Sequence, residues 1–417
     1  MNPAKPFAIH KRQVWEAYKR VKANQGGAGI DAQTLEDFAQ DLGNNLYKLW
    51  NRMASGSYHP PPVKRVEIPK ADGGIRPLGI PTVADRIAQT VVKQVLEPEL
   101  EKHFHPDSYG YRPGKSAHQA LAITRKRCWS YQWVLEFDIK GYFDSIDHQL
   151  LMRAVGRHTQ EKWVLLYIKR WLRAPVQMVD GKIQVRERGT PQGGVISPLL
   201  ANLYLHYTFD LWMQKNYPEI PFARYADDGV LHCRTRWQAE QLKQVLQERF
   251  AACGLELHPL KTRVVYCKNY QCTGKYPTVA FDFLGYTFRP RGAERKDGKG
   301  LFTGFLPAIS NKAAKAIRQE VRSWSLQNKS SKSLYDLARM FNAPIQGWIA
   351  YYGRFYRSAL NPIWKHLNYK LVLWAARKFK RFRGHRRRAE RWLLDVAQRQ
   401  PDLFAHWRLF YGSKLTG

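Results

Sequence analysis

Two apolar, β-type runs of this chain each end at aspartates, and this feature constrains the fold more than any other. Asp138 ends a run that begins at Trp133, and Asp227 and Asp228 lie at the centre of a strand, turn and strand pattern over 222–233. Acidic residues are scarce, with 34 Asp and Glu against 68 Lys and Arg, so the aspartates at these positions stand out in the sequence. Apolar strands pack into one sheet, and we expect the three carboxylates to converge at its edge.

Adjacent aspartates at a turn repel each other, and a divalent cation would neutralise them. Carboxylates from two strands can hold two Mg²⁺ ions roughly 3.5–4 Å apart, one activating an attacking 3′-hydroxyl and the other stabilising the leaving pyrophosphate. The alternative is that Asp227-Asp228-Gly229 is only a turn sequence, which is the commoner meaning of this tripeptide in isolation. For the neighbouring Asp144 and Asp147 we expect capping or structural roles.

The net charge of +34 indicates a polyanionic partner, and we expect nucleic acid. Residues 301–417 contain 23 Lys or Arg and five Asp or Glu, so a net +18 lies in little more than a quarter of the chain. Phe379 and Phe382 are interleaved with the densest cations, which suits backbone phosphates and base stacking. A basic, solvated surface without a specific partner is the alternative.

Length and composition limit the class of protein. A chain of 417 residues with 44% hydrophobic residues predicts two or three packed units. It has no uninterrupted apolar run of about 18 residues, and no apolar signal segment near its start, so we expect neither a membrane span nor secretion. The five scattered cysteines predict reduced thiols and a cytoplasmic location. The sequence contains no Cys-x-x-Cys pair, so we do not expect a zinc site.

Hydrophobic periodicity predicts alternating helices and antiparallel strands, then a basic helical region. A short helix over 9–24 comes before a glycine-rich turn. Turn residues place a domain boundary between Arg289 and Leu306. The expected helices cover 33–53, 83–104, 147–173 and 237–253, with further helices after residue 311, and the expected strands cover 63–69, 133–139, 222–233, 264–267 and 281–288.

The aspartates belong to a set of motifs that follow one another in a fixed order. The set resembles the sequence blocks of group II intron-encoded reverse transcriptases, with Tyr225-Ala-Asp-Asp228 as the Tyr-x-Asp-Asp signature. Ile345–Tyr352 resembles the maturase, or thumb, domain of that family. The other blocks are Arg76–Arg86 with Gln89, Ser108–His118, Phe137–Asp144, Gly189–Pro198, Gly254–Thr262 and Phe283–Tyr286.

The resemblance implies a role for individual residues. Asp138, Asp227 and Asp228 would bind two Mg²⁺ ions, with Mn²⁺ as an alternative, and the Ile139 carbonyl would add an oxygen ligand. The implied nucleotide-binding residues are Lys70 and Arg76 on the triphosphate, Phe143 as a steric gate against the ribose 2′-hydroxyl, Gln192 beneath the nucleotide and Lys261 near the leaving group. The implied primer grip is Phe283, Leu284, Gly285 and Tyr286.

Several of these residues have a simpler interpretation. Phe143 is an aromatic residue after a strand, where core packing is common. Lys261 has the alternative of a solvated charge, and Lys70 and Arg76 flank a hairpin tip where surface cations are frequent. The aromatic residues of the C-terminal region are more typical of a core than of a stacking platform.

The fold class implied is α+β: a right-hand polymerase with fingers, palm and a helical thumb. We expect an N-terminal helical extension over 1–30, fingers and palm over 31–295, a thumb or maturase domain over 305–375 and a basic nucleic-acid-binding tail over 376–417. The family's DNA endonuclease carries Cys-pair and His-rich motifs after this region. The printed sequence does not contain them, so we do not expect second-strand cleavage from it.

The implied activity is RNA-directed DNA polymerisation, in which a DNA or RNA primer on an RNA template is extended with dNTPs. Group II intron RNA and target DNA are the further partners implied. Two alternatives stay open: an RNA-binding splicing maturase with secondary polymerisation, and a domesticated reverse transcriptase in host defence or DNA repair. The oligomeric state does not follow from the sequence.

Overall fold

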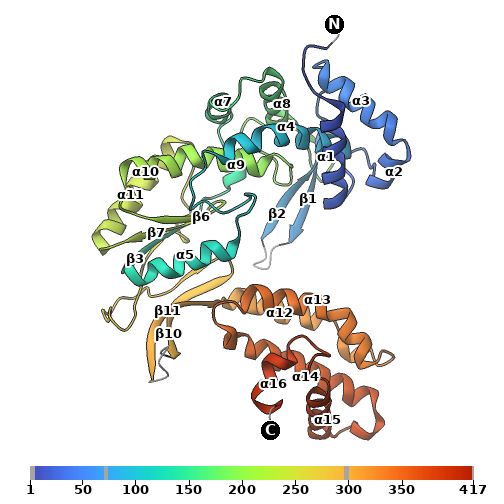
Figure 1. Ribbon diagram of the computed structural model, residues 1–417, viewed down its shortest axis with the longest axis vertical. Coiled ribbons are helices and arrows are strands. Elements are labelled where there is room, and N and C mark those ends of the chain that lie inside the picture. Colours follow the sequence, from blue (N-terminus) through green and yellow to red (C-terminus); the bar gives the residue numbers. More distant parts are fainter. Residues whose placement is uncertain (1–4, 70–73, 295–299, 416–417) are drawn as a thin grey trace. The chain divides into compact units, whose positions relative to one another are not determined.

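The computed structural model describes residues 5–69, 74–294 and 300–415 (Figure 1). The chain packs as two compact units. The first unit comprises Met1–Thr124 and Trp133–Val264, and the second comprises Arg125–Gln132 and Val265–Gly417. Each unit combines helices with mainly antiparallel strands, so the predicted α+β class is confirmed.

The N-terminal helix α1 (Lys11–Asn24) is part of the first unit. It buries Val14, Ala17, Tyr18 and Val21, the apolar face that the periodicity predicts, and packs against α4 (Val83–Glu101). Arg86 of α4 donates to the carbonyls of residues 25 and 27, at 3.2 and 2.9 Å, and so closes the glycine-rich turn after α1.

The helices expected in the first unit are present, two of them with a break, and the structure adds helices that the sequence did not predict, including the one over Ala117–Ser130. The helix expected over 33–53 is divided at Asp41, and that expected over 147–173 is divided at residues 157–161, where the chain leaves helical geometry. Helix α5 begins in the first unit and ends in the second. The helices are α2 (Leu35–Gln40), α3 (Leu42–Ala54), α5 (Ala117–Ser130), α6 (Tyr142–Ser145), α7 (His148–Gly156), α8 (Lys162–Arg173), α9 (Ser197–Leu205), α10 (Leu211–Asn216) and α11 (Arg236–Ala252).

One sheet of the first unit has the order β2-β1-β4-β5. Strand β1 (Val63–Pro69) pairs antiparallel with β2 (Ile75–Ile80), so that Ile68 lies opposite Arg76, and parallel with β4 (Val176–Gln177). Strand β4 forms a short hairpin with β5 (Ile183–Gln184). The predicted hairpin of β1 and β2 is therefore present, and residues 70–73 between its strands lie outside the described residues.

The second sheet has the order β6-β7-β3-β8 and contains the strands that end at aspartates. Phe137 on β3 contacts Phe209 and Phe250, with ring centroids 5.1 and 5.6 Å apart, which fixes this sheet against a helical layer. Figure 1 shows α10 and α11 beside these strands. The strands are β3 (Trp133–Phe137), β6 (Phe222–Tyr225), β7 (Asp228–Cys233) and β8 (Arg263–Tyr266).

The second unit begins with a sheet of order β11-β10-β9. The strands are β9 (Phe281–Phe283), β10 (Tyr286–Glu294) and β11 (Leu301–Ile309), and β10 and β11 pair along their full lengths. The boundary expected between Arg289 and Leu306 therefore falls inside a hairpin. Gly292 and the arginines before it, which indicate a turn in the sequence, lie within β10, and the units divide at residue 264 instead.

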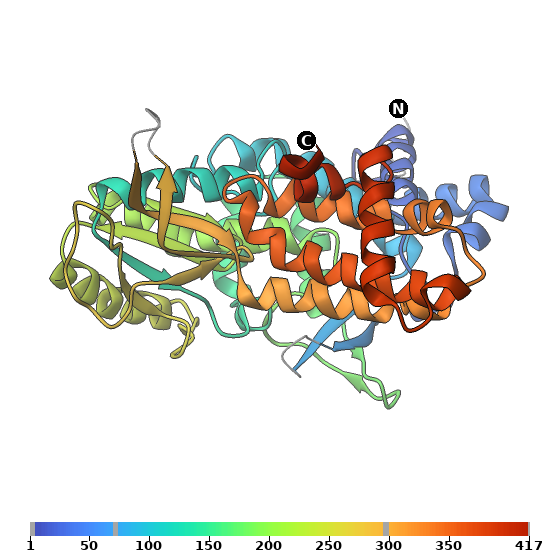
Figure 2. The same ribbon diagram turned by 90° about the horizontal axis from the view of Figure 1, so that it is seen from below.

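The helices of the second unit share one hydrophobic core, with Trp364, Trp374 and Trp407 almost completely buried. Figure 2 shows α15 crossing the direction of α14. The segment expected as a separate basic tail is therefore partly core: Phe382 is buried, and Phe379 packs on Trp392. The helices are α12 (Asn311–Ser323), α13 (Leu334–Tyr352), α14 (Asn361–Lys378), α15 (Arg386–Arg399) and α16 (Trp407–Leu415).

Within the described ranges, no helix has both the length and the apolar character that a membrane crossing requires.

Candidate active site

Asp138, Asp227 and Asp228 meet at one end of the β3–β7 ladder. In that ladder Phe137 lies opposite Gly229, and the same register continued by one residue places Asp138 opposite Asp228. Asp227 belongs to the two-residue turn that joins β6 to β7, in which Tyr225 pairs with Asp228. The tight turn and the strand register therefore bring Asp138 together with two adjacent carboxylates, Asp227 and Asp228, that lie far from it in the sequence.

Burial and the neighbouring negative charges raise the pKa of two of these carboxyl groups. Burial is the main cause that raises the pKa of Asp227, and the Asp138 charge raises it further. Burial also raises the pKa of Asp228 to about 8, with smaller contributions from the charges of Asp227 and Asp138 and from a side-chain hydrogen bond with Asp138. At neutral pH the cluster therefore favours a bound proton.

Lys261 is the cation that faces this cluster. Its Nζ donates to Asp138 Oδ2 at 2.7 Å, although 60% of the lysine side chain is exposed. That hydrogen bond is the largest cause that raises the pKa of Lys261, so the ammonium stays protonated. The alternative of an isolated solvated charge is not what the geometry shows, because the ammonium is paired with a site carboxylate.

Ile139 forms an isolated antiparallel bridge with Leu257. Lys140 N donates to Glu256 O at 2.9 Å, and His258 N donates to Asp138 O at 2.8 Å. In such a bridge the residue between the two bonded positions directs its own N–H and C=O to the other side. The Ile139 carbonyl is thereby directed to the side of β3 on which β7 lies.

Phe143 lies in the short helix α6, directly after the Asp138 strand, and is partly exposed. Its ring makes edge-to-face contacts with Tyr111 and Tyr142, with centroids 6.4 and 5.6 Å apart. Its carbonyl accepts a hydrogen bond from Thr190 N at 2.7 Å. The ring therefore packs against two tyrosines and is still partly exposed to solvent, unlike a buried core residue.

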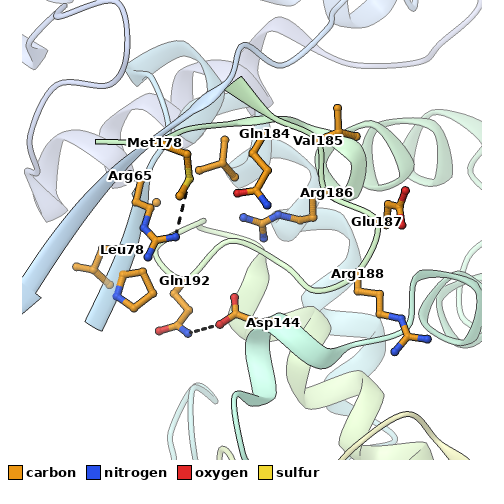
Figure 3. Close-up of a pocket in the computed structure, with 13 residues that line it drawn as sticks. Arg65, Leu78, Asp144, Met178, Gln184, Val185, Arg186, Glu187, Arg188 and Gln192 are labelled. Atoms are coloured by element: carbon orange, nitrogen blue, oxygen red, sulfur yellow. Dashed lines mark hydrogen bonds between the residues drawn. The ribbon is translucent and has the colours of Figure 1, made fainter. Parts of the chain in front are cut away.

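Gln192 connects the glycine-rich segment to both neighbouring parts of the first unit. Its side-chain amide donates to Asp144 Oδ2 at 3.4 Å, and its carbonyl accepts from Gly79 N of β2 at 2.6 Å (Figure 3). Gly193 has a φ of +113°, and a Cβ there would lie 2.6 Å from the Gly79 carbonyl oxygen. Glycine is required here because two backbones approach each other closely.

Of the two hairpin cations, Lys70 lies outside the described residues. Arg76 is exposed on β2, and its charge is close enough to lower the pKa of Asp227 against the larger effect of burial. The structure thus brings Arg76 near the carboxylates.

A pocket of about 360 Å³ adjoins Gln192 and Asp144 (Figure 3). Three arginines line it. Arg65 donates to Met178 Sδ at 3.9 Å, and burial lowers the pKa of Arg186 while the Asp144 charge opposes that effect. Arg188 is exposed at the rim. Cations therefore outnumber acids around this pocket.

The four residues expected to form a primer grip belong to the second unit, where they form the β9–β10 turn. Phe283 and Tyr286 are buried, and Tyr286 packs on Tyr351 and Tyr352. Of the four, only the turn residues Leu284 and Gly285 are partly exposed.

Sequence reasoning assigned Asp147 correctly as a cap, because its side chain accepts from Leu150 N at 2.8 Å at the start of α7. It assigned no role to Tyr111, whose 50% exposed ring lies against Phe143 and whose φ is +57°. It also missed Arg224 and Asp210, a fully buried ion pair beside the aspartate turn. The available signal for Arg224 was a charged residue inside an apolar strand.

Two regions of the chain match known protein families. Residues 68–288 match the reverse transcriptase (RNA-dependent DNA polymerase) family, and residues 314–392 match the group II intron, maturase-specific domain. The structure of telomerase from Candida albicans with a fragment of telomeric RNA is similar with a TM-score of 0.47 and 13% identity, over 90% of this chain and 67% of that one.

Two curated relatives extend the sequence match. Protein YkfC of Escherichia coli K12 is 33% identical over 265 residues, which cover 54% of this chain and 69% of YkfC. The group II intron-encoded protein LtrA of Lactococcus lactis subsp. cremoris is 32% identical over 283 residues, 64% of this chain, and the match spans only 46% of LtrA. The chain therefore belongs to the reverse transcriptase family, the RNA-dependent DNA polymerases, and carries the maturase-specific domain of group II intron proteins.

Proposed function

We propose that the first unit extends a primer 3′-hydroxyl with dNTPs on an RNA template, and that Asp138, Asp227 and Asp228 are its catalytic residues. The observation that carries this proposal is the convergence of the three carboxylates at the end of the β3–β7 ladder. The primer is DNA or RNA, because the mechanism needs only its 3′-hydroxyl. In this proposal the first unit supplies most of the fingers and palm expected over 31–295, and the thumb expected over 305–375 belongs to the second unit.

The donor set suits Mg²⁺, with Mn²⁺ as the alternative, because carboxylate and carbonyl oxygens are hard ligands. In the part of the chain that the structure describes, no three His, Cys, Asp or Glu side chains stand ready as a metal cage. The raised pKa of Asp228 favours a bound proton there, and the Lys261 ammonium adds a second positive charge beside Asp138. We infer that these three aspartates and the Ile139 carbonyl hold two divalent ions.

When bound, the metal pair supplies Lewis-acid activation of the 3′-hydroxyl and charge stabilisation on the triphosphate. The chain's own residues would do the rest. Arg76, with Lys70, would hold the triphosphate oxygens, and Gln192 would support the nucleotide from the side of Asp144. Lys261, kept protonated beside Asp138, would donate a proton to the departing pyrophosphate.

Phe143 would exclude a ribose 2′-hydroxyl, because its ring is partly exposed shortly after the strand that leads to Asp138. Replacing Phe143 with Ala should lower the selectivity for dNTPs over NTPs by on the order of 10-fold or more, measured by competing single-nucleotide incorporation. Unchanged selectivity would assign the ring to packing alone.

The second unit would bind nucleic acid, including the intron RNA of a group II intron and its DNA target. Its cations support this, as does the match of residues 314–392 to the maturase-specific domain. Phosphate contacts, rather than stacking on the buried Phe382, would dominate. If the protein is mainly a splicing maturase, then a variant with all three aspartates replaced by alanine should still stimulate splicing of its intron RNA.

We also propose a cytoplasmic location. None of the five cysteines forms a disulfide, which is typical of a reducing compartment.

The experiment that tests the polymerase proposal is primer extension by the full chain. An RNA template annealed to a DNA primer, with dNTPs and Mg²⁺, should give full-length DNA, and chelation by EDTA should stop the reaction. Absence of extension with Mg²⁺ and with Mn²⁺, by protein shown to be folded, would refute the proposal.

A further inference from the structure

Arg224 is a fully buried arginine one residue before the Tyr-Ala-Asp-Asp turn. Its Nε and Nη2 donate to the two oxygens of Asp210 at 2.8 and 2.6 Å, and neither side chain is exposed. Its Nη1 donates to Asn202 Oδ1 at 3.1 Å and to the Ala226 carbonyl at 2.9 Å. One guanidinium therefore joins a carboxylate, an amide and the backbone of the turn.

The two side-chain partners of Arg224, Asn202 and Asp210, lie on one continuous helical segment. The number of residues per helical turn changes between them. A π-helical turn over His206–Asp210 separates α9, which carries Asn202, from α10. Eight residues of regular α-helix would rotate Asp210 by about 80° from Asn202. A π-helical turn absorbs one extra residue and reduces this difference to about 20°, so that both side chains reach the same guanidinium.

The backbone that Arg224 holds is in an unfavourable conformation. Ala226 has a φ of +55°, at the first central position of a two-residue hairpin turn, where glycine is preferred. Such a conformation is unfavourable for an L-residue and persists only when its surroundings impose it.

A second contact closes the turn from the other side. A Cβ on Gly110 would lie 2.4 Å from Ala226 N, so the two backbones touch. The Gly110 carbonyl accepts from Asn202 Nδ2 at 2.6 Å, and Arg224 N donates to Asp107 O at 2.9 Å. The turn is thus enclosed by the Arg224 guanidinium on one side and by the 107–110 segment on the other.

We propose that Arg224, oriented by Asp210 and Asn202, is the positioning residue that imposes the left-handed conformation of Ala226 and thereby presents Asp227 and Asp228 for metal binding. The inference rests on the proposed function only in taking these aspartates as metal ligands. Since Asp210 neutralises its charge within the same pair, Arg224 acts through the geometry of the turn. It makes no contact with the reacting atoms.

The test measures Mn²⁺ binding to the metal-free full chain, with electron paramagnetic resonance as the method of detection. An Arg224→Lys variant retains the charge but loses the planar fork, and we expect its Mn²⁺ affinity to fall about 10- to 100-fold, as for other residues that orient metal ligands. Arg170→Lys is the matched control, because Arg170 donates to the carbonyls of Gly56 and Tyr58, away from the aspartates. It should bind Mn²⁺ as the parent chain does.

A rescue separates positioning from a general role in packing. Adding Ala226→Gly to the Arg224→Lys variant removes the cost of a positive φ, so part of the lost Mn²⁺ affinity should return. If Arg224→Lys does not fold, Asn202→Ala leaves the ion pair in place, and it should weaken Mn²⁺ binding several-fold. Parental Mn²⁺ affinity in the folded variant, or no gain in the double variant, would overturn the inference.

Failure of the proposed function gives a different result. A parent chain that binds Mn²⁺ and loses it with Asp227→Asn, but extends no primer, would contradict the polymerase proposal and leave the positioning role of Arg224 intact. A parent chain that extends primers while a folded Arg224→Lys binds Mn²⁺ normally would contradict only the positioning role.

Discussion

The molecule contains two tight hairpin turns that can be compared directly, one in each unit. In the first unit, Tyr225–Asp228 joins β6 to β7, and in the second, Phe283–Tyr286 joins β9 to β10. Each turn has two central residues and places a non-glycine residue at positive φ, +55° for Ala226 and +52° for Leu284. The same local strain is therefore stabilised twice in one chain.

The two turns are held by different kinds of contact. The Ala226 carbonyl accepts from the guanidinium of a buried ion pair, whereas the Leu284 carbonyl accepts from the neutral Tyr351 hydroxyl at 2.9 Å. In the second turn the next carbonyl, that of Gly285, accepts from Ser310 N at 2.9 Å. A turn that presents two like charges needs a rigid support, and the buried charge pair supplies it. The stability of the turn then depends on both partners of the pair, because the loss of one leaves the other charge buried and unpaired.

The largest effect expected is on the support of the first turn. Asp210→Ala leaves the Arg224 charge buried without its partner, and should lower the free energy of unfolding of the first unit by about 3–5 kcal/mol. Urea denaturation measures this loss. Asp402→Ala is the control: it breaks the Asp402–Arg408 pair, which is equally short at 2.5 Å but exposed, and should leave the urea midpoint unchanged. Equal effects would show that burial does not distinguish the two pairs.

The charges that the first turn presents should make metal binding dependent on pH. The pKa of Asp228 is raised from its ordinary value to about 8. Between pH 4 and 8, the folded metal-free chain therefore keeps a proton that the unfolded chain has already lost. Its contribution to stability is therefore present at low pH and is lost as the pH rises toward 8, by at most about 1.4 kcal/mol per pH unit.

A divalent ion must displace that proton, so Mg²⁺ affinity should rise between pH 6 and 8, by up to about tenfold per unit, and level off above 8. The measurement is the increase in Tm on adding Mg²⁺ to the EDTA-treated protein at each pH. Asp228→Asn should remove the pH dependence. A Tm increase independent of pH in the parent chain would contradict the proton exchange.

The smallest effect is expected at the second turn. Tyr351→Phe removes the hydroxyl that donates to Leu284 O and should cost about 1 kcal/mol, as for a single neutral hydrogen bond. Thermal unfolding measures the change, and Mn²⁺ binding by the same variant should stay at the parental level. A loss as large as that of Asp210→Ala would show that the two turns depend equally on their supports.

Local signals explain what the sequence could predict. The strand, turn and strand pattern around Asp227 and the apolar run before Asp138 contain their own turn residues and alternation, so their meeting in one sheet could be expected. The same holds for α1, whose four buried residues follow helical spacing. The Asp147 cap was also readable, because a capping aspartate acts within three residues of itself.

What the sequence could not reveal depends on contacts between distant segments or on the side of an element that a residue occupies. The Arg224–Asp210 pair needs a π-helical turn that has no clear sequence signal. Phe382 was expected among exposed cations, yet it is buried, because composition counts charges without telling which face of a helix they cover. The boundary expected between Arg289 and Leu306 falls in the hairpin of β10 and β11, because the same residue types occur in hairpins and at domain boundaries.

The most direct test of the central claim compares two aspartates of the first unit by single-nucleotide incorporation on an RNA template. Asp227→Asn should reduce the rate on the order of a thousand-fold, because metal-ion stabilisation of the transition state is worth several kcal/mol. Asp147→Asn should keep the parental rate, because asparagine caps a helix as well as aspartate does. Near-parental incorporation by Asp227→Asn would contradict the account.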